Sequence, residues 1–72
     1  MLYFISYDLK TPGKDYSKLY EKIKNIGSTW AHPMDSLWFV QTSRANIAQE
    51  ISDSLLTVMD KNDRLLVGAF AS

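Results

Sequence analysis

The fold of this chain is decided by the stretch Leu2-Tyr3-Phe4-Ile5-Ser6-Tyr7-Asp8, which is rich in aromatic and β-branched residues. That composition, followed by a polar and turn-prone loop at residues 10–14, predicts a β-strand over residues 2–8. Side chains alternate between the two faces of a strand, and here both faces are mostly apolar. A strand with two apolar faces lies in the middle of a sheet and is covered on both sides.

A helix is predicted after this loop, because the apolar residues there recur at helical spacing. Asp15 is a candidate N-cap, and Gly27 is a candidate end in the left-handed conformation that closes many helices. Two further strands are predicted over residues 28–32 and 36–42, joined by a hairpin turn at residues 33–35. The second of these strands again has apolar side chains on both faces.

A second helix is predicted from an apolar stripe whose members are Ile47, Ile51, Leu55 and Val58. Thr42 or Ser43 is its candidate N-cap, and it ends near residues 60–63, before a last strand over residues 64–70. The resulting order is that of an α+β, ferredoxin-like βαββαβ sandwich. Right-handed crossovers then place the first and third strands in the middle of a four-stranded antiparallel sheet, with both helices on one face.

The length of 72 residues allows one domain, which spans residues 1–72, with one marginal core. A domain of this size buries only about 60% of its unfolded surface, and its core rarely supplies more than roughly 3–5 kcal/mol. Because the central strands also carry apolar side chains on the face without helices, we expect that face to be buried against a second copy. The chain is therefore predicted to form a homodimer through the helix-free sheet face.

The amino-acid composition and the net charge argue against several classes of function. Cysteine is absent, which excludes disulfides and thiolate chemistry, and eight basic residues are balanced by eight acidic ones. Net neutrality removes the strongest general argument for nucleic-acid binding, which is a large positive field. No apolar run approaches the roughly 20 residues of a membrane span, and the N-terminus lacks a basic start and a cleavage site. We therefore expect a cytoplasmic protein without membrane contact.

Asp8 is the first candidate for chemistry, since it ends an apolar strand and precedes the loop. A carboxylate there can bind a hard cation such as magnesium, although one carboxylate per chain is too few. A dimer that brought two copies of Asp8 together would supply a pair, and a bridging cation would relieve their repulsion. The alternative is structural: Asp8 caps the loop through an Asx-type turn.

His32, Asp35 and Ser36 are the residue types of an acid–base or nucleophilic set, because an imidazole titrates near neutrality. A hairpin tip provides no evident pocket or oxyanion donors, so Asp35 and Ser36 fit turn formation better. The lysines on the outer side of the first helix form either a solvated face or a phosphate-contacting edge; they are Lys14, Lys18, Lys22 and Lys24.

Four aromatic residues have two explanations; they are Tyr3, Tyr7, Trp30 and Trp38. The first is stacking on bases, as aromatic residues do on the open sheets of small RNA-binding folds. Trp38 and its neighbours lack the basic and glycine residues of the RNA-recognition signature. A hydrophobic core or a dimer interface therefore explains the four better.

Several motifs together resemble known proteins. The stretch from Tyr3 to Leu9, followed by a short loop and an amphipathic helix that ends in Gly27, resembles the start of the small CRISPR-associated endoribonuclease-like proteins and is similar to virulence-associated protein D. Nearly the whole chain resembles the short bacterial and phage proteins labelled SinR family, through Ile5-Ser6-Tyr7-Asp8-Leu9, Pro12-Gly13, Asp15-Tyr16, Asp35-Ser36-Leu37-Trp38 and Asn62-Asp63-Arg64-Leu65-Leu66-Val67.

The resemblance implies a ferredoxin-like homodimer in which Asp8 meets its counterpart in the dimer and binds a divalent metal for phosphodiester cleavage. Only Asp8 is carried over as a site residue. The CRISPR-associated members have basic surfaces and can be structural rather than catalytic in their complexes, whereas this chain is neutral.

Two functional hypotheses from different classes follow. In the first, the protein is a metal-dependent nuclease acting on RNA or DNA, in which magnesium bridges two Asp8 carboxylates, polarises a phosphate and activates water. In the second, it is a non-catalytic adaptor or a binding module for nucleic acid, a small nucleotide or a protein partner. Its contact residues would then be Lys10, Lys14, Arg44 and Arg64, with Asp8 anchoring the loop. The place of Asp8 favours the nuclease, and neutrality favours the binder.

Overall fold

The structure is a computed structural model that describes residues 1–11 and 13–70. Pro12, which belongs to the predicted loop and to one of the motifs, and the last two residues lie outside the described part. Along the chain the elements are β1 (Leu2–Asp8), α1 (Ser17–Lys24), β2 (Thr29–Met34), β3 (Leu37–Gln41), α2 (Ala48–Leu56) and β4 (Arg64–Ala69). The predicted order of strands and helices is therefore confirmed.

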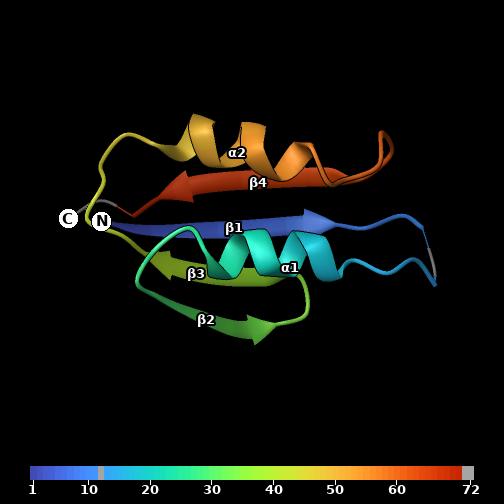
Figure 1. Cartoon of the computed structure of the whole chain (residues 1–72), viewed down its shortest axis with the longest axis horizontal. Helices are drawn as coiled ribbons and strands as arrows, with labels where there is room; N and C mark the ends of the chain where they lie inside the picture. Colours follow the sequence, from blue (N-terminus) through green and yellow to red (C-terminus); the bar gives the residue numbers. More distant parts are fainter. Residues whose placement is uncertain (12, 71–72) are drawn as a thin grey trace.

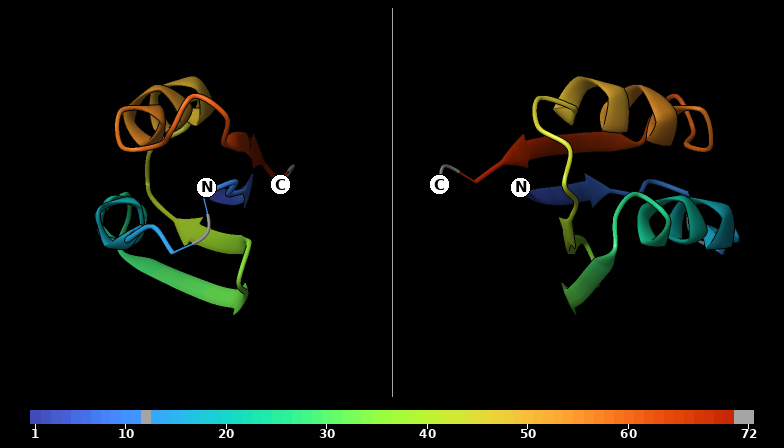
Figure 2. Two further views of the ribbon diagram at one scale, coloured as in Figure 1. Left: turned by 90° about the vertical axis from the view of Figure 1, so that its right-hand side faces the viewer. Right: turned by 60° about the vertical axis from the view of Figure 1, so that its left-hand side comes forward.

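The four strands form one antiparallel sheet in the order β2-β3-β1-β4, and both helices cover the same face of it (Figures 1 and 2). This is the predicted α+β arrangement, with the ferredoxin-like βαββαβ topology. β1 is central: Ile5 lies opposite Trp38 on β3 and opposite Val67 on β4. Within the described residues, neither helix is long and apolar enough to cross a membrane.

The hydrophobic core lies between the sheet and the two helices. Alternate residues of β1 and β3 enter it, and the helices contribute residues spaced three or four apart, as each periodicity requires. Its buried members are Tyr3, Ile5, Tyr7, Tyr16, Leu19, Ile23, Trp38, Val40, Ile47, Ile51 and Leu55. Burying one large aliphatic side chain of this kind stabilises a fold by about 1.5–3 kcal/mol, so this layer carries most of the stability.

The ends of α1 differ from the predicted caps. The helix begins at Ser17, whose backbone N–H donates to the Asp15 carboxylate at 2.9 Å, so Asp15 binds the first turn from outside the N-cap position. The helix ends at Lys24, and the predicted left-handed end at Gly27 is wrong, because only Gly13 and Asn46 of the described residues have positive φ. Gly27 is instead required by space, since a Cβ there would lie 2.8 Å from the Gln41 carbonyl carbon.

The start of α2 also lies later than predicted. Ile47 occupies the N-cap position and the helix begins at Ala48, so neither Thr42 nor Ser43 caps it. Thr42 is buried at the end of β3, where its hydroxyl accepts the backbone N–H of Arg44 at 3.3 Å. The helix then stops at residue 56, and turns rather than helix connect it to β4. The predicted capping residue therefore forms the turn that leaves β3.

The hairpin turn is shorter than predicted. β2 continues through Pro33 to Met34, so the turn consists of Asp35 and Ser36. β2 is an edge strand, and an edge strand tolerates proline because one side of its backbone needs no partner. The ladder between β2 and β3 is irregular between Ala31 and Met34. The proline and this irregularity occur on the same edge of the sheet.

Candidate functional site

The sheet face opposite the helices is mostly apolar, and we call it the open sheet face. The strand registers place on it Leu2, Phe4, Ser6, Asp8, Leu37, Phe39, Arg64, Leu66 and Gly68, and ring contacts add Phe70. Both helices lie on the other side of the sheet (Figure 2). Leu66 is 61% exposed at the centre of β4. The alternation predicted from the sequence is thus confirmed.

Three phenylalanines are packed together on the open sheet face. Phe70 contacts Phe4 and Phe39 edge to face, with ring centroids 5.5 and 5.7 Å apart. The ring of Phe4 lies across β4 where Gly68 has no side chain, since a Cβ at Gly68 would overlap that ring. An ordered apolar surface of this kind is typical of a protein interaction site.

Asp8 lies at the margin of the open sheet face, where β1 ends. In the strand register it lies opposite Arg64 of β4, and its Oδ2 forms an ion pair with Lys10 Nζ at 2.6 Å. The Asp8 side chain is 59% exposed, and it borders a hollow of about 190 Å³ that Arg64 and Leu66 also line. Among the described residues its carboxylate accepts no backbone hydrogen bond. Asp8 is therefore accessible from solvent.

One chain by itself does not assemble a metal site at Asp8. In residues 1–11 and 13–70 no group of three or more His, Asp or Glu side chains is placed to hold a metal ion. Magnesium is commonly bound by one or two carboxylates together with the phosphates of its substrate. An exposed carboxylate fits that donor set, provided that a second chain supplies the other carboxylate.

The four predicted basic contact residues do not form one patch. Lys10 and Arg64 lie beside Asp8, whereas Lys14 Nζ lies 2.5 Å from the Asp60 carboxylate. Arg44 lies at the other end of β1, where its carbonyl accepts the hydroxyl of Tyr3. Its guanidinium makes two hydrogen bonds to Glu50, of 2.6 and 2.9 Å, which raise the pKa of Arg44 and lower that of Glu50.

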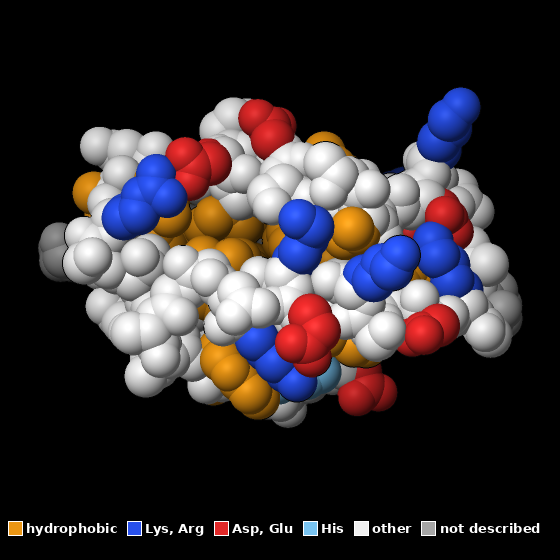
Figure 3. Space-filling model, viewed as in Figure 1, with side chains coloured by type: hydrophobic (Ala, Val, Ile, Leu, Met, Phe, Trp, Pro, Cys, Tyr) orange, Lys and Arg blue, Asp and Glu red, His pale blue; other side chains and the backbone are white. Residues whose placement is uncertain are grey.

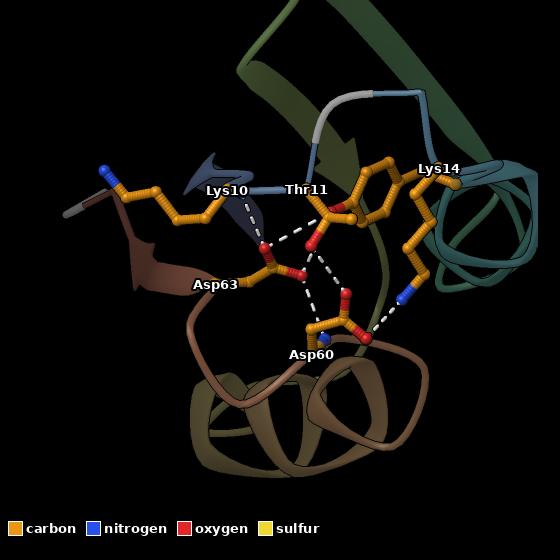
Figure 4. A network of polar contacts seen from close by, with 6 residues as sticks. Lys10, Thr11, Lys14, Asp60 and Asp63 are labelled. Carbon is orange, nitrogen blue, oxygen red and sulfur yellow. Dashed lines mark hydrogen bonds and ion pairs between the residues drawn. The ribbon is translucent and has the colours of Figure 1, made fainter.

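Asp60 and Asp63, which the sequence analysis did not identify as site residues, hold the loop after Asp8 in place (Figure 4). The Asp63 carboxylate accepts the backbone N–H groups of Lys10 and Asp60 at 2.8 and 2.9 Å, and the hydroxyl of Tyr16 at 3.2 Å. Asp60 in turn accepts the hydroxyl of Thr11 at 2.9 Å. Two aspartates three residues apart, shortly after α2, are typical of a turn, so the sequence indicates the turn but not its contacts with the loop.

The charges of this network are stable at neutral pH. Burial of Asp63 opposes its ionisation, but the hydrogen bonds from the amides of Lys10 and Asp60 and from the Tyr16 hydroxyl together hold its pKa below the usual value. Hydrogen bonds from Lys14 and Thr11 lower the pKa of Asp60. The same contact with Asp60 raises the pKa of Lys14. Lys14 is therefore engaged in joining the loop to the turn before β4.

Three of the four aromatic candidates belong to the core. Tyr3, Tyr7 and Trp38 are buried. Trp38 Nε1–H donates to the Tyr7 hydroxyl at 2.9 Å, and that hydroxyl donates to the Asp35 carbonyl at 2.7 Å. Burial raises the pKa of Tyr7 to about 12. Trp30 differs from these three, because it is 47% exposed.

The possible acid–base set at the hairpin is not assembled. The His32 ring lies flat on Trp38, with 3.7 Å between ring centroids. Its Nε2 lies 3.2 Å from the backbone carbonyl of Asp35, not from the carboxylate. Within the described residues His32 makes no hydrogen bond to Ser36. His32 therefore packs against an aromatic ring, and Asp35 and Ser36 form the turn.

Comparison with known proteins leaves the geometry as the main guide to function. No protein-family model matches this chain, and no curated protein shows significant similarity to it. The resemblance to the CRISPR-associated and SinR-labelled proteins stays a prediction. The open sheet face and the carboxylate of Asp8 at its margin are the structural features that bear on function.

Proposed function

We propose that the protein acts as a homodimer in which two open sheet faces pack together and two Asp8 carboxylates form a divalent-cation site for phosphodiester cleavage. The observation that carries this proposal is the open sheet face itself, with its exposed leucine and phenylalanine side chains. A stable interface of standard size buries about 800 Å² per partner. That is about a sixth of the chain's surface of 4740 Å².

A second copy of this chain is the partner that fits the open sheet face. The centre of the face is apolar, and its margin carries one acidic and one basic residue, Asp8 and Arg64. A two-fold interface applies the same patch twice, so the apolar centre of one copy packs on the apolar centre of the other. The chain has no net charge, and long-range repulsion therefore does not oppose association.

The chemistry at such a dimer margin follows from three residues. Asp8 is accessible and belongs to the open sheet face, so two copies would supply two oxygen ligands. A divalent cation bound there supplies Lewis-acid activation of a phosphate and of a water molecule. Lys10 and Arg64, which flank Asp8, carry the positive charges that contact phosphate oxygens.

The dimer is tested by a matched pair of leucines. Leu66, on the open sheet face, and Leu56, on the outside of α2, are 61% and 48% exposed in one chain. We expect light scattering at micromolar concentration to give twice the mass of one chain for the wild type and for Leu56→Lys. Leu66→Lys is expected to give the mass of one chain, because it buries an unpaired charge in the interface.

A wild-type protein that remains monomeric at these concentrations would contradict the dimer. Dissociation of Leu56→Lys with retention of the Leu66→Lys dimer would place the interface on the helices instead. Circular dichroism of both variants checks that each chain keeps its fold.

Cleavage is tested with Asp8→Ala. Labelled single-stranded RNA and DNA are incubated with magnesium, manganese or a chelator. We expect cleavage that requires metal and that falls about 100-fold or more in Asp8→Ala, because Lewis-acid stabilisation amounts to several kcal/mol and 1.36 kcal/mol is tenfold in rate. Asp53→Ala is the control, since Asp53 is an exposed aspartate of α2 that accepts a hydrogen bond from the side-chain amide of Gln49. Equal products from wild type and Asp8→Ala rule out the nuclease.

The second candidate is a binding module without catalysis, for nucleic acid, a small nucleotide or a protein partner. It is favoured by the positive groups around Asp8, because the ion pair with Lys10 competes with a metal ion for the carboxylate. In this case Asp8→Ala leaves binding intact, and no cleavage appears with any metal. Binding through phosphate contacts weakens as salt is raised, which distinguishes it from binding of an apolar protein partner.

A further inference from the structure

An exposed aromatic cluster lies on the helix side of the sheet, at the edge formed by β2. It consists of Tyr20 and Lys24 from α1 and Trp30 and His32 from β2, and we call it the aromatic edge. Residues four apart share one face of a helix, and residues two apart share one face of a strand. The two pairs therefore face each other where α1 approaches the margin of the sheet (Figure 1).

The buried ring of Trp38 is the floor of the aromatic edge. His32 is stacked on it at 3.7 Å, with an angle of 14° between the rings. The rings of Trp30 and Tyr20 lie 5.3 and 6.0 Å from it, and Lys24 Nζ lies 5.1 Å from the centre of the Trp30 ring. Hydrophobic side chains, basic and acidic groups and the histidine are seen together at the lower margin of Figure 3.

Two rings of the aromatic edge are exposed to solvent. Trp30 keeps 47% of its surface exposed, although it is one of only two tryptophans. His32 is also exposed, although one face of its ring is covered by Trp38. A dimer formed through the open sheet face would leave both rings uncovered, because they lie on the other side of the sheet.

The aromatic edge is continuous with the surroundings of Asp8. A hollow of about 220 Å³ is lined by Tyr7, Asp8, Leu9, Tyr20, Asp35 and Ser36. Tyr20 thus contributes to this hollow and also contacts the His32 ring, with 6.3 Å between centroids. Tyr20 therefore lies between the hollow beside Asp8 and the rings of the aromatic edge.

We propose that the aromatic edge binds unpaired bases of a single-stranded nucleic acid by stacking, with Lys24 contacting a phosphate. This inference rests on the proposed function, because it assigns the form of nucleic acid that reaches Asp8. Aromatic rings bind bases of any sequence through their faces, whereas the bases of a duplex are already stacked on one another. Stacking also explains how a neutral chain binds nucleic acid without a large positive field.

The test is binding without metal, so that cleavage plays no part. A fluorescein-labelled single strand of about ten nucleotides, as RNA and as DNA, is titrated at low salt in EDTA and followed by anisotropy. We expect Trp30→Ala to weaken binding about tenfold or more, and Trp30→Phe to restore most of it. Leu56→Ala is the matched control, since Leu56 is 48% exposed on α2 and is expected to leave binding unchanged.

A second measurement does not depend on the folding of an alanine variant. Stacking of a base on Trp30 is expected to quench the tryptophan fluorescence of the wild type when the unlabelled strand is added. Trp30→Phe retains only the buried Trp38 and is expected to lose this quenching. The same oligonucleotide as a duplex is expected to bind several-fold more weakly and to quench little.

Each outcome separates this inference from the proposed function. Equal binding by wild type and Trp30→Ala, or no binding of the wild type at low salt, overturns the stacking site. Failure of the proposed function appears elsewhere, as a monomer or as equal cleavage by wild type and Asp8→Ala. Neither of those results changes the affinity measured in EDTA.

Discussion

Asp63→Ala is expected to remove most of the stability of the chain. The carboxylate accepts two backbone N–H groups and the hydroxyl of Tyr16, and it is buried where three segments meet (Figure 4). Donors left without a partner in a buried site cost about 1–3 kcal/mol each. With partial access of water the total loss is roughly 2–4 kcal/mol, against about 3–5 kcal/mol from a core of this size.

Urea unfolding followed by circular dichroism measures this loss. Asp63→Asn is the informative comparison, because it keeps the size of the side chain but replaces one accepting oxygen by a donor. We expect its midpoint to lie between those of the wild type and Asp63→Ala. An unchanged midpoint for Asp63→Ala would show that water replaces the carboxylate at no cost.

The same network predicts acid sensitivity. The folded chain holds the pKa values of Asp60 and Asp63 below their usual value, which is about 3.9 in an unfolded chain. A lowered carboxyl pKa contributes stability that is fully present above the unfolded value and is lost as the pH falls through the folded one. The free energy of unfolding is therefore expected to fall below about pH 4, and to fall less steeply in Asp63→Asn.

The second large effect is expected at Gly27. In Gly27→Ala the new methyl group would overlap the Gln41 carbonyl, which accepts the backbone N–H of Ser28 at 2.9 Å. Backbone atoms cannot rotate away as a side chain can, so the connection between α1 and β2 must move away from β3. Overpacking of this kind costs about 1–3 kcal/mol or more, and loss of the hydrogen bond adds about 1 kcal/mol.

Gly68→Ala is the matched control, because it makes the same chemical change on a strand. Its methyl group would meet the end of the Phe4 ring, and a side chain can rotate to a new position where a backbone carbonyl cannot. We expect a loss below about 1 kcal/mol at Gly68, well under that at Gly27. Thermal unfolding separates the two, since 1 kcal/mol shifts the midpoint by about 4–8 °C in a domain of this size. Equal losses at both positions would contradict the rigid contact at Gly27.

The strands, the helices and the direction in which strand side chains point could be predicted, because they depend on local periodicity. The predicted strand over residues 2–8 matches β1 in full, and Leu37 and Trp38 point to opposite faces as their positions require. The helix caps could not be predicted in the same way. Thr42 has the right chemistry for an N-cap, but burial at the end of β3 uses its hydroxyl in a turn.

The candidate site was only partly predictable. The place of Asp8 at the end of β1 follows from the strand pattern, and its position beside Arg64 follows once β4 is known to pair with β1. Asp63 was missed because its principal partner, Lys10, lies 53 positions away. The aromatic edge likewise joins residues of α1 and β2 that share no local pattern.

The order of the elements, the central place of β1 and the apolar character of both sheet faces follow from the residue pattern alone, because alternation and helical spacing act between near neighbours. Which polar groups meet and which aromatic rings stay exposed depends on how the whole chain packs. Lys14 and Arg44 are paired with Asp60 and Glu50, and Trp30 remains accessible beside Lys24. These contacts join separate segments of the chain, and they form only when the whole chain packs.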